Sequence, residues 1–248
     1  MIFWVTNRCG MGCSHCLSRC ESEGTDFNTN NLHKAARLIK ESTCKAVIIS
    51  GGEPSLHPEI VDIVKFFKKE LPKCMITLAS NGQFLQNTEL TDKLISCCDS
   101  IQITSDLRYY PNPIKHIYRL KKISPKIATE DHILSVAAYG RALDNNIKSE
   151  GYEKMSPFCF NLRSIIKRSG KTFVEACQIM EGRHKFCFWA INPDGGVSIS
   201  ESMCCPTVGS INDSVKELTK NISEFRCNQC VYAKALIEEG GAYKEVLI

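Results

Sequence analysis

Three cysteines close to the start of the chain have a spacing that can hold an iron–sulfur cluster. Cys9, Cys13 and Cys16 form the pattern C-x3-C-x2-C directly after a short apolar stretch. Thiolates are the usual ligands of such clusters, and a four-iron cluster normally takes four of them. Three thiolates therefore leave one iron open, and an open iron can bind and reduce another molecule. A zinc site on the same residues is the alternative that this spacing leaves open.

A second motif follows the next predicted strand. Gly51, Gly52 and Glu53 come after the apolar run 46–50, which is typical of a buried parallel strand. Together with the cysteine spacing, this motif resembles the radical S-adenosylmethionine (SAM) superfamily. The resemblance implies a [4Fe-4S] cluster on the three cysteines whose open iron binds exchangeable SAM. It also implies an enzyme that cleaves SAM to a 5′-deoxyadenosyl radical, which abstracts a hydrogen atom from the substrate.

The resemblance further implies SAM contacts at the carboxyl ends of the strands. Gly51 and Gly52 would let the backbone approach the ligand closely, and Glu53 can accept a hydrogen bond from the amino group of SAM. His15 precedes the third cysteine, where family members usually carry an aromatic residue near the adenine. The other expected contacts are polar residues at strand ends, which could equally be solvated loop positions: Ser80, Asn81, Thr104, Asp106 and Glu130.

Apolar periodicity alternates between strand-like and helix-like segments through the first half of the chain. The expected strands are 2–6, 46–50, 75–79, 100–105 and 126–129. The expected helices are 30–41, 58–71, 88–96, 113–123, 134–145 and 173–180. This alternation implies an α/β fold with a parallel sheet, either open or curled into a partial barrel. The family resemblance favours a partial (β/α)6 TIM-like barrel over residues 1–184.

The pattern changes near residue 185, where a second group of cysteines begins. The sequence predicts a β-hairpin with its turn at 192–196, followed by a helix near 213–221. The cysteines resemble those of a twitch domain, the smaller relative of the SPASM domain, and imply an auxiliary [4Fe-4S] cluster in a small hairpin and helix domain over 185–248. The implied ligands are Cys187, Cys204 or Cys205 (with Cys204 favoured), Cys227 and Cys230. A zinc ribbon would satisfy the same thiolates.

Three functions follow as hypotheses. An auxiliary cluster whose four irons all have cysteine ligands could not bind the substrate, but it could accept an electron from the substrate radical. This implies oxidation or cross-linking of a peptide or a small metabolite. This logic is similar to that of the butirosin-pathway aminocyclitol dehydrogenase and the anaerobic sulfatase-maturating enzymes. A redox-neutral epimerase is the second hypothesis, with Cys20 or Cys159 able to return a hydrogen atom. A non-catalytic iron–sulfur or zinc protein is the third. No catalytic residue is assigned, and His132, Arg141 and Arg163 lie where substrate-facing groups could come.

Composition limits the cellular setting and the partners. The 248 residues are 43% apolar and 23% charged, as is typical of globular proteins, and no apolar run approaches the ~20 residues that span a membrane. No secretion signal is present, so fifteen cysteines indicate a reducing cytoplasm and metal-bound thiolates. A net charge of +4 is too small to imply nucleic acid. The expected partners are the substrate and an electron donor such as flavodoxin or ferredoxin.

Overall fold

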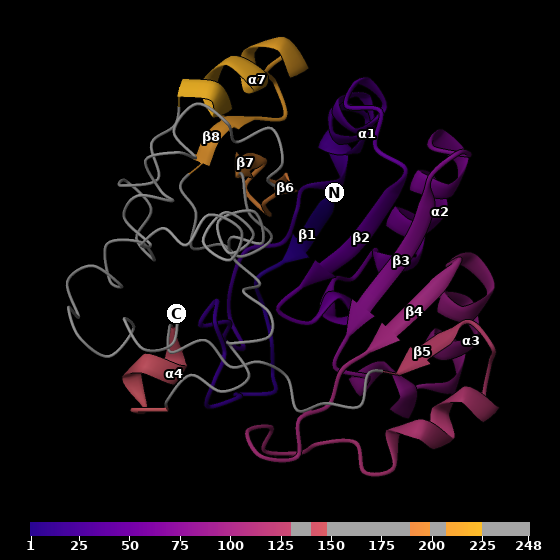
Figure 1. Ribbon diagram of the computed structural model, residues 1–248. Coiled ribbons are helices and arrows are strands. Elements are labelled where there is room, and N and C mark those ends of the chain that lie inside the picture. Colours follow the sequence, from indigo (N-terminus) through magenta and orange to yellow (C-terminus); the bar gives the residue numbers. More distant parts are fainter. Residues whose placement is uncertain (130–139, 148–188, 199–206, 225–248) are drawn as a thin grey trace, which may run out of the picture.

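An eight-stranded sheet lies at the centre of the computed structural model (Figure 1). The structure describes residues 1–129, 140–147, 189–198 and 207–224. The strands lie side by side in the order β5-β4-β3-β2-β1-β6-β7-β8. Their bounds are β1 Ile2–Thr6, β2 Ala46–Gly51, β3 Met75–Ser80, β4 Ser100–Ile103, β5 Ile127–Thr129, β6 Ala190–Ile191, β7 Gly196–Ser198 and β8 Thr207–Ser210.

Strands β1 to β5 are parallel to their neighbours, and they follow one another in chain order. Their register places Ile2 beside Ile48, and Ile48 beside Thr77. All five residues of β1 are buried, because parallel strands are covered on both faces. The five parallel strands predicted in the first half of the chain are therefore confirmed.

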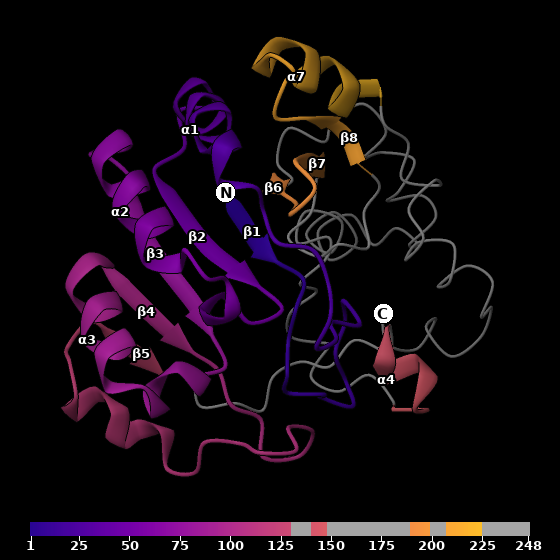
Figure 2. The same cartoon turned by 180° about the vertical axis from the view of Figure 1, so that it is seen from behind.

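Helices α1, α2 and α3 cover the same face of this sheet, as two opposite views show (Figures 1 and 2). Phe3 of β1 packs edge-on against Phe27 at 4.7 Å and against Phe67 of α2 at 4.9 Å between ring centroids, which forms the centre of the core. The α-helices are α1 Leu32–Glu41, α2 Ile60–Glu70, α3 Thr88–Cys97, α4 Arg141–Asp144 and α7 Val215–Glu224. The 3-10 helices are η1 Thr29–Asn31, η2 Pro54–Leu56, η3 Gln83–Gln86 and η4 Ile117–Lys122.

The connection from β4 to β5 differs from its prediction. An α-helix was expected over 113–123, but the chain forms only η4 there, and residues 104–116 are irregular. The left-handed backbone of His116 explains the difference, because a residue with positive φ cannot continue a right-handed helix through 113–123. His116, at the start of η4, has a φ of 59°. The carboxyl end of β4 therefore opens into an extended loop, which lies close to the loop after β1.

The predicted C-terminal hairpin and helix are both present. Strands β6 and β7 pair in antiparallel fashion around a turn in which Gly195 has a φ of 83°, and α7 follows β8. Strand β6 also pairs with β1, so the hairpin extends the main sheet (Figure 2). The proposed division into residues 1–184 and 185–248 stays a prediction. None of the helices in the described ranges is both long enough and apolar enough to cross a membrane.

Candidate active site

The candidate site lies at the carboxyl end of β1, where the loop that carries the cysteines begins. The residues that follow β2 run beside the start of this loop. The N–H of Gly52 donates to the Thr6 carbonyl at 2.9 Å, and that of Glu53 donates to the Arg8 carbonyl at 2.8 Å. A Cβ atom at Gly51 would lie 2.5 Å from the Thr6 oxygen, and one at Gly52 would lie 2.3 Å from the Arg8 oxygen. The two glycines therefore allow two backbone segments to touch. Their predicted approach to SAM is a separate contact and stays a prediction.

The three predicted cluster cysteines lie together on this loop, and all three are half-buried. Burial raises the pKa of Cys13 to about 12, and the sulfurs of Cys9 and Cys16 add to the rise. Burial also raises the pKa of Cys9, with Glu53 and Cys16 contributing. The three thiols therefore lie close enough for their charges to affect one another.

Two glycines of this loop, Gly10 and Gly12, are exposed. Apart from adjacent residues, no heavy atom of the described chain lies within 4 Å of a Cβ built at Gly10 or Gly12. Within the same described ranges, no three His, Cys, Asp or Glu side chains are grouped so that they could hold a single metal ion. Three half-buried cysteines on one loop fit the predicted iron–sulfur cluster, whose irons are held by separate thiolates.

A fourth cysteine lies against this loop. Cys20 is buried beside Ile2 and Trp4, and Cys9 and Cys16 pack against the same small cluster. A side-chain hydrogen bond with Cys20 lowers the pKa of Cys16 to about 6, while the same bond and burial raise the pKa of Cys20. Cys20 therefore lies within hydrogen-bonding reach of the Cys16 sulfur. From the sequence, Cys20 was expected only as a candidate hydrogen-atom donor to a substrate.

Glu53 connects the carboxyl ends of β2 and β3. Its carboxylate is fully buried and accepts hydrogen bonds from the Ser55 N–H (3.0 Å), the Ser55 hydroxyl (2.6 Å), the Ser80 hydroxyl (2.9 Å) and the Asn81 N–H (2.9 Å). Burial raises the pKa of Glu53, and these hydrogen bonds oppose the rise. The side-chain amide of Asn81 points at the Cys9 sulfur, 3.8 Å away. Three predicted SAM contacts thus form one network beside the cysteines.

The predicted contacts at the end of β4 have partners within their own loop. Asp106 is buried and accepts two hydrogen bonds from the Arg108 guanidinium, at 3.1 and 2.9 Å. Burial alone would raise the pKa of Asp106, but the guanidinium reverses the effect and lowers it. The hydroxyls of Thr104 and Tyr110 are 3.2 Å apart. Asp106 therefore stabilises this loop and has its charge balanced there.

His15 stacks against two aromatic rings from the loop after β4. Its ring centroid is 5.0 Å from that of Tyr109 and 5.7 Å from that of Tyr110, with tilts of 35° and 32°. Its Nδ1 is buried and has no hydrogen-bond partner among the described residues. Burial lowers the pKa of His15, which favours the neutral ring. Neither tyrosine was predicted from the sequence; the available signal was an aromatic pair in the loop that follows β4.

Several residues that the sequence predicts for the sites lie outside the part of the chain that the structure describes. These residues are Glu130, His132, Cys159, Arg163, Cys187, Cys204, Cys205, Cys227 and Cys230. Four further cysteines belong to the core or its edge, as expected for packing residues: Cys44, Cys74, Cys97 and Cys98.

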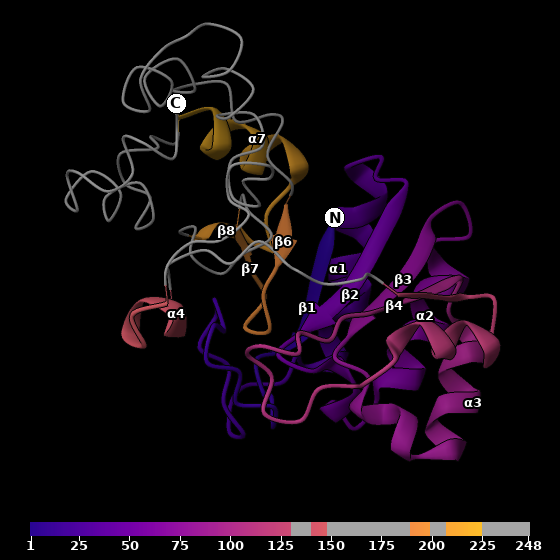
Figure 3. The ribbon, with the colours of Figure 1, turned by 60° about the horizontal axis from the view of Figure 1, so that its bottom comes forward.

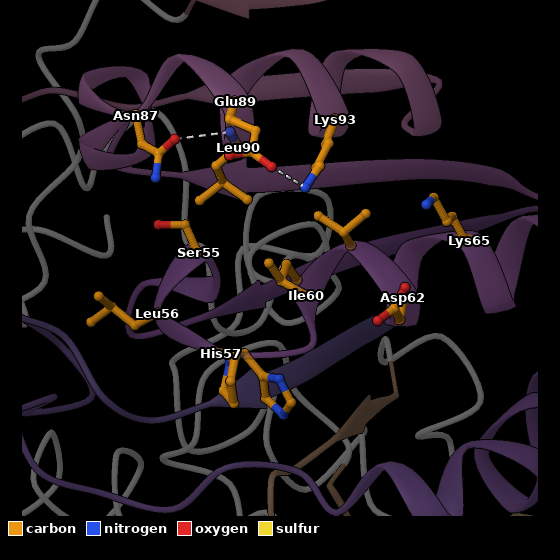
Figure 4. Close-up of a pocket in the computed structure, with 12 residues that line it drawn as sticks. Ser55, Leu56, His57, Ile60, Asp62, Lys65, Asn87, Glu89, Leu90 and Lys93 are labelled. Atoms are coloured by element: carbon orange, nitrogen blue, oxygen red, sulfur yellow. Dashed lines mark hydrogen bonds and ion pairs between the residues drawn. The ribbon is translucent and has the colours of Figure 1, made fainter.

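A surface pocket of about 420 Å³ lies between the start of α2 and the start of α3 (Figure 4). Several residues of its polar lining already have partners, such as Glu89 and Lys93, whose charged atoms are 2.5 Å apart. His57, which lines the same pocket, is bonded through Nε2 to the Phe27 carbonyl oxygen. No cysteine lines this pocket, so it is separate from the candidate site.

Comparison with known sequences gives one family. Residues 5–142, more than half of the chain, match the model of the Radical SAM superfamily. The GTP 3′,8-cyclase of Clostridium perfringens is 29% identical over 153 residues, which are 58% of this chain and 42% of that protein. The probable GTP 3′,8-cyclase of Methanocaldococcus jannaschii is 34% identical over 96 residues, which are 36% of this chain and 30% of that protein. The match spans less than half the length of either relative.

Comparison with solved structures agrees on the fold. BtrN in complex with AdoMet and 2-DOIA superposes with a TM-score of 0.52 at 14% identity, over 99% of this chain and 89% of that one. Streptococcus suis SuiB bound to the precursor peptide SuiA gives 0.52 at 13% identity, over 96% and 72%. The anSMEcpe structure with AdoMet and the Cp18Cys peptide gives 0.51 at 13% identity, over 93% and 85%. These likenesses confirm the predicted α/β, partial-barrel class and concern the fold alone.

Proposed function

Because the chain belongs to the radical SAM superfamily, we propose that it is an enzyme that cleaves SAM reductively and removes a hydrogen atom from its substrate. Membership implies a [4Fe-4S] cluster and SAM, which supply the 5′-deoxyadenosyl radical when bound. The observation that carries the proposal is the gathering of Cys9, Cys13 and Cys16 on the loop after β1.

In this proposal the surrounding residues hold the site in shape. The three cysteines bind the cluster, and the Asn81 amide orients the Cys9 sulfur by a weak N–H···S contact. Glu53 keeps the ends of β2 and β3 together, which places Asn81. The rings of His15 and Tyr110 offer a flat surface for the adenine of SAM. Thr104, which is bonded to Tyr110, positions that ring.

The second part of the proposal is an oxidation or a cross-linking. An auxiliary [4Fe-4S] cluster on the C-terminal cysteines would take an electron from the substrate radical. The hairpin of β6 and β7 supports this, since it lies between Cys187 and Cys204 in the sequence and folds that segment back on itself. The proposed substrate is a peptide or a small metabolite: SuiB was solved with a precursor peptide, and BtrN with 2-DOIA. Flavodoxin or ferredoxin is the proposed electron donor.

The direct test is reductive cleavage of SAM. The chain is purified without oxygen, loaded with iron and sulfide, reduced with dithionite and mixed with SAM. We expect 5′-deoxyadenosine to accumulate only when dithionite, SAM and the loaded protein are all present. A chain that carries its iron and yet releases no 5′-deoxyadenosine would contradict the proposal.

Iron analysis tests the auxiliary cluster separately. The loaded chain should contain about eight irons, and the double variant Cys227→Ala/Cys230→Ala should contain about four, because each cubane cluster holds four. The matched control is Cys44→Ala/Cys74→Ala, which removes two cysteines at the edge of the core and should leave the iron content unchanged. Zinc in place of half of the iron would indicate a zinc ribbon instead.

Cys20 supports one competing function, a closed cluster that only carries electrons. Its sulfur is hydrogen-bonded to Cys16, so a fourth thiolate ligand is at hand. Cys20→Ala separates the two functions. Under our proposal this variant keeps its N-terminal iron and still yields 5′-deoxyadenosine. If Cys20 were the fourth ligand, the wild-type chain would not cleave SAM, and Cys20→Ala would either lose iron or begin to cleave SAM.

A further inference from the structure

Helix α4 lies against the cysteine loop, although more than 120 residues separate the two segments (Figure 3). The backbone N–H of Arg141 donates to the Cys16 carbonyl at 2.9 Å. Its guanidinium donates to the Cys13 carbonyl at 3.4 Å and to the Cys20 carbonyl at 2.5 Å. Arg141 therefore contacts the loop at three points, on both sides of the third predicted cluster ligand.

The neighbours of Arg141 show that this contact is closely fitted. Gly140 has a φ of 61°, and a Cβ there would lie 2.3 Å from the Leu17 carbonyl oxygen. The side chain of Asn145 donates to the Ser14 carbonyl at 2.8 Å. Asp144 accepts two hydrogen bonds from Arg19, at 2.8 and 2.9 Å. Only glycine permits this approach at position 140, so residues 140–147 are seated directly on the loop.

The guanidinium also acts on the thiols electrostatically. It favours the thiolate form of Cys9, Cys13 and Cys16, in opposition to burial. Its carboxylate partner is Glu21, at 3.8 Å, whose side chain is 74% exposed while that of Arg141 is 20% exposed. Water screens the exposed carboxylate more strongly than the half-buried guanidinium. The net effect of this ion pair at the thiols is therefore that of a positive charge, which opposes the negative charge of Glu53.

We propose that Arg141 is a positioning residue that holds the cysteine loop through its carbonyls and, by its charge, raises the reduction potential of the cluster bound there. This rests on the proposed function, because it concerns the same cluster. The potential of an iron–sulfur cluster depends on net charge and on groups beyond its ligands. Reduction adds an electron, so a nearby positive charge stabilises the reduced form. Arginine suits both tasks, since its planar fork donates to two carbonyls while it stays charged.

The test is an EPR-monitored redox titration of the full loaded chain. At the wild-type midpoint potential of the N-terminal cluster, Arg141→Met should lower the ratio of reduced to oxidised cluster roughly tenfold, which corresponds to a shift of about 59 mV for one electron. Arg141→Lys should restore most of the potential, because it keeps the charge. A second wave from an auxiliary cluster should not move, because the side-chain contacts of Arg141 among the described residues are with the N-terminal loop.

Asn145→Ala is the matched control. It removes one neutral hydrogen bond between the same helix and the same loop, so it loosens the contact without changing charge. Its potential should match that of the wild type. An unchanged potential in Arg141→Met, or equal shifts in Arg141→Met and Asn145→Ala, would overturn the inference and leave the proposed function standing. A wild-type chain without iron on the N-terminal cysteines would overturn both.

Discussion

Cys13→Ala should lower the formation of 5′-deoxyadenosine more than ~10²-fold and remove iron from the N-terminal site. Losing a group that only orients a metal ligand costs about 10–100-fold, and Cys13 is proposed as a ligand itself. Burial and the neighbouring sulfurs raise its pKa to about 12 in the chain without metal, so bound iron is needed to hold a thiolate there. Product assay and iron analysis on the same preparation measure both effects.

Cys97→Ala is the control for this prediction. Cys97 ends α3, is half-buried and packs against the core. The chemical change is the same, but the position is remote from the loop after β1. We expect this variant to keep both its iron and its SAM cleavage. Wild-type yields from Cys13→Ala would show that the chemistry does not depend on the N-terminal loop.

Glu53→Ala should destabilise the chain by about 3 kcal/mol or more, since a hydrogen bond to a charged group contributes roughly 1.5–3 kcal/mol and several are lost together. The buried N–H groups of Ser55 and Asn81 and the hydroxyl of Ser80 would lose their common acceptor. SAM cleavage should fall as well, because Asn81 would no longer be held beside Cys9. Urea-induced unfolding under anaerobic conditions, followed by circular dichroism, measures the decrease in the free energy of unfolding.

Two further variants serve as comparisons for the stability loss expected in Glu53→Ala. Glu53→Gln should also destabilise, though less, because each carboxylate oxygen faces a backbone N–H and an amide can accept on only one side. Glu89→Ala removes an exposed carboxylate that pairs with Lys93, and such surface pairs contribute only about 0.2–1 kcal/mol. Equal stability of Glu53→Ala and Glu89→Ala would show that Glu53 does not connect β2 to β3.

The sequence was sufficient to predict the first five strands and the position of the cysteine loop after the first of them. Apolar runs such as 46–50 predict buried parallel strands, because both faces of such a strand are covered. Strand ends then predict which loops share one edge of the sheet, which correctly placed Cys9 near Glu53 and Asn81. The absence of the expected α-helix before β5 was not predicted, because the left-handed backbone at His116 that interrupts it has no local sequence signal such as glycine.

Other parts of the site depend on contacts between segments far apart in the chain. The amide and hydroxyl groups that surround Glu53 come from the end of β3, so the sequence motif alone predicted a SAM contact and did not predict this internal network. The stacking of His15 on Tyr109 and Tyr110 requires the loops after β1 and β4 to meet. Nothing in a local pattern specifies these partners, because side-chain contacts follow from how the strands associate.

The chemistry of this protein was therefore readable in short motifs, because ligand spacing and turn glycines are local requirements. The side chains that surround the cysteines could not be predicted from such motifs, and Arg141 is the clearest case. The sequence left it unassigned, and only the folded chain brings it onto the carbonyls of Cys13 and Cys20. Packing between distant segments is decided by the whole core, so the charge beside the thiols is a property of the tertiary structure.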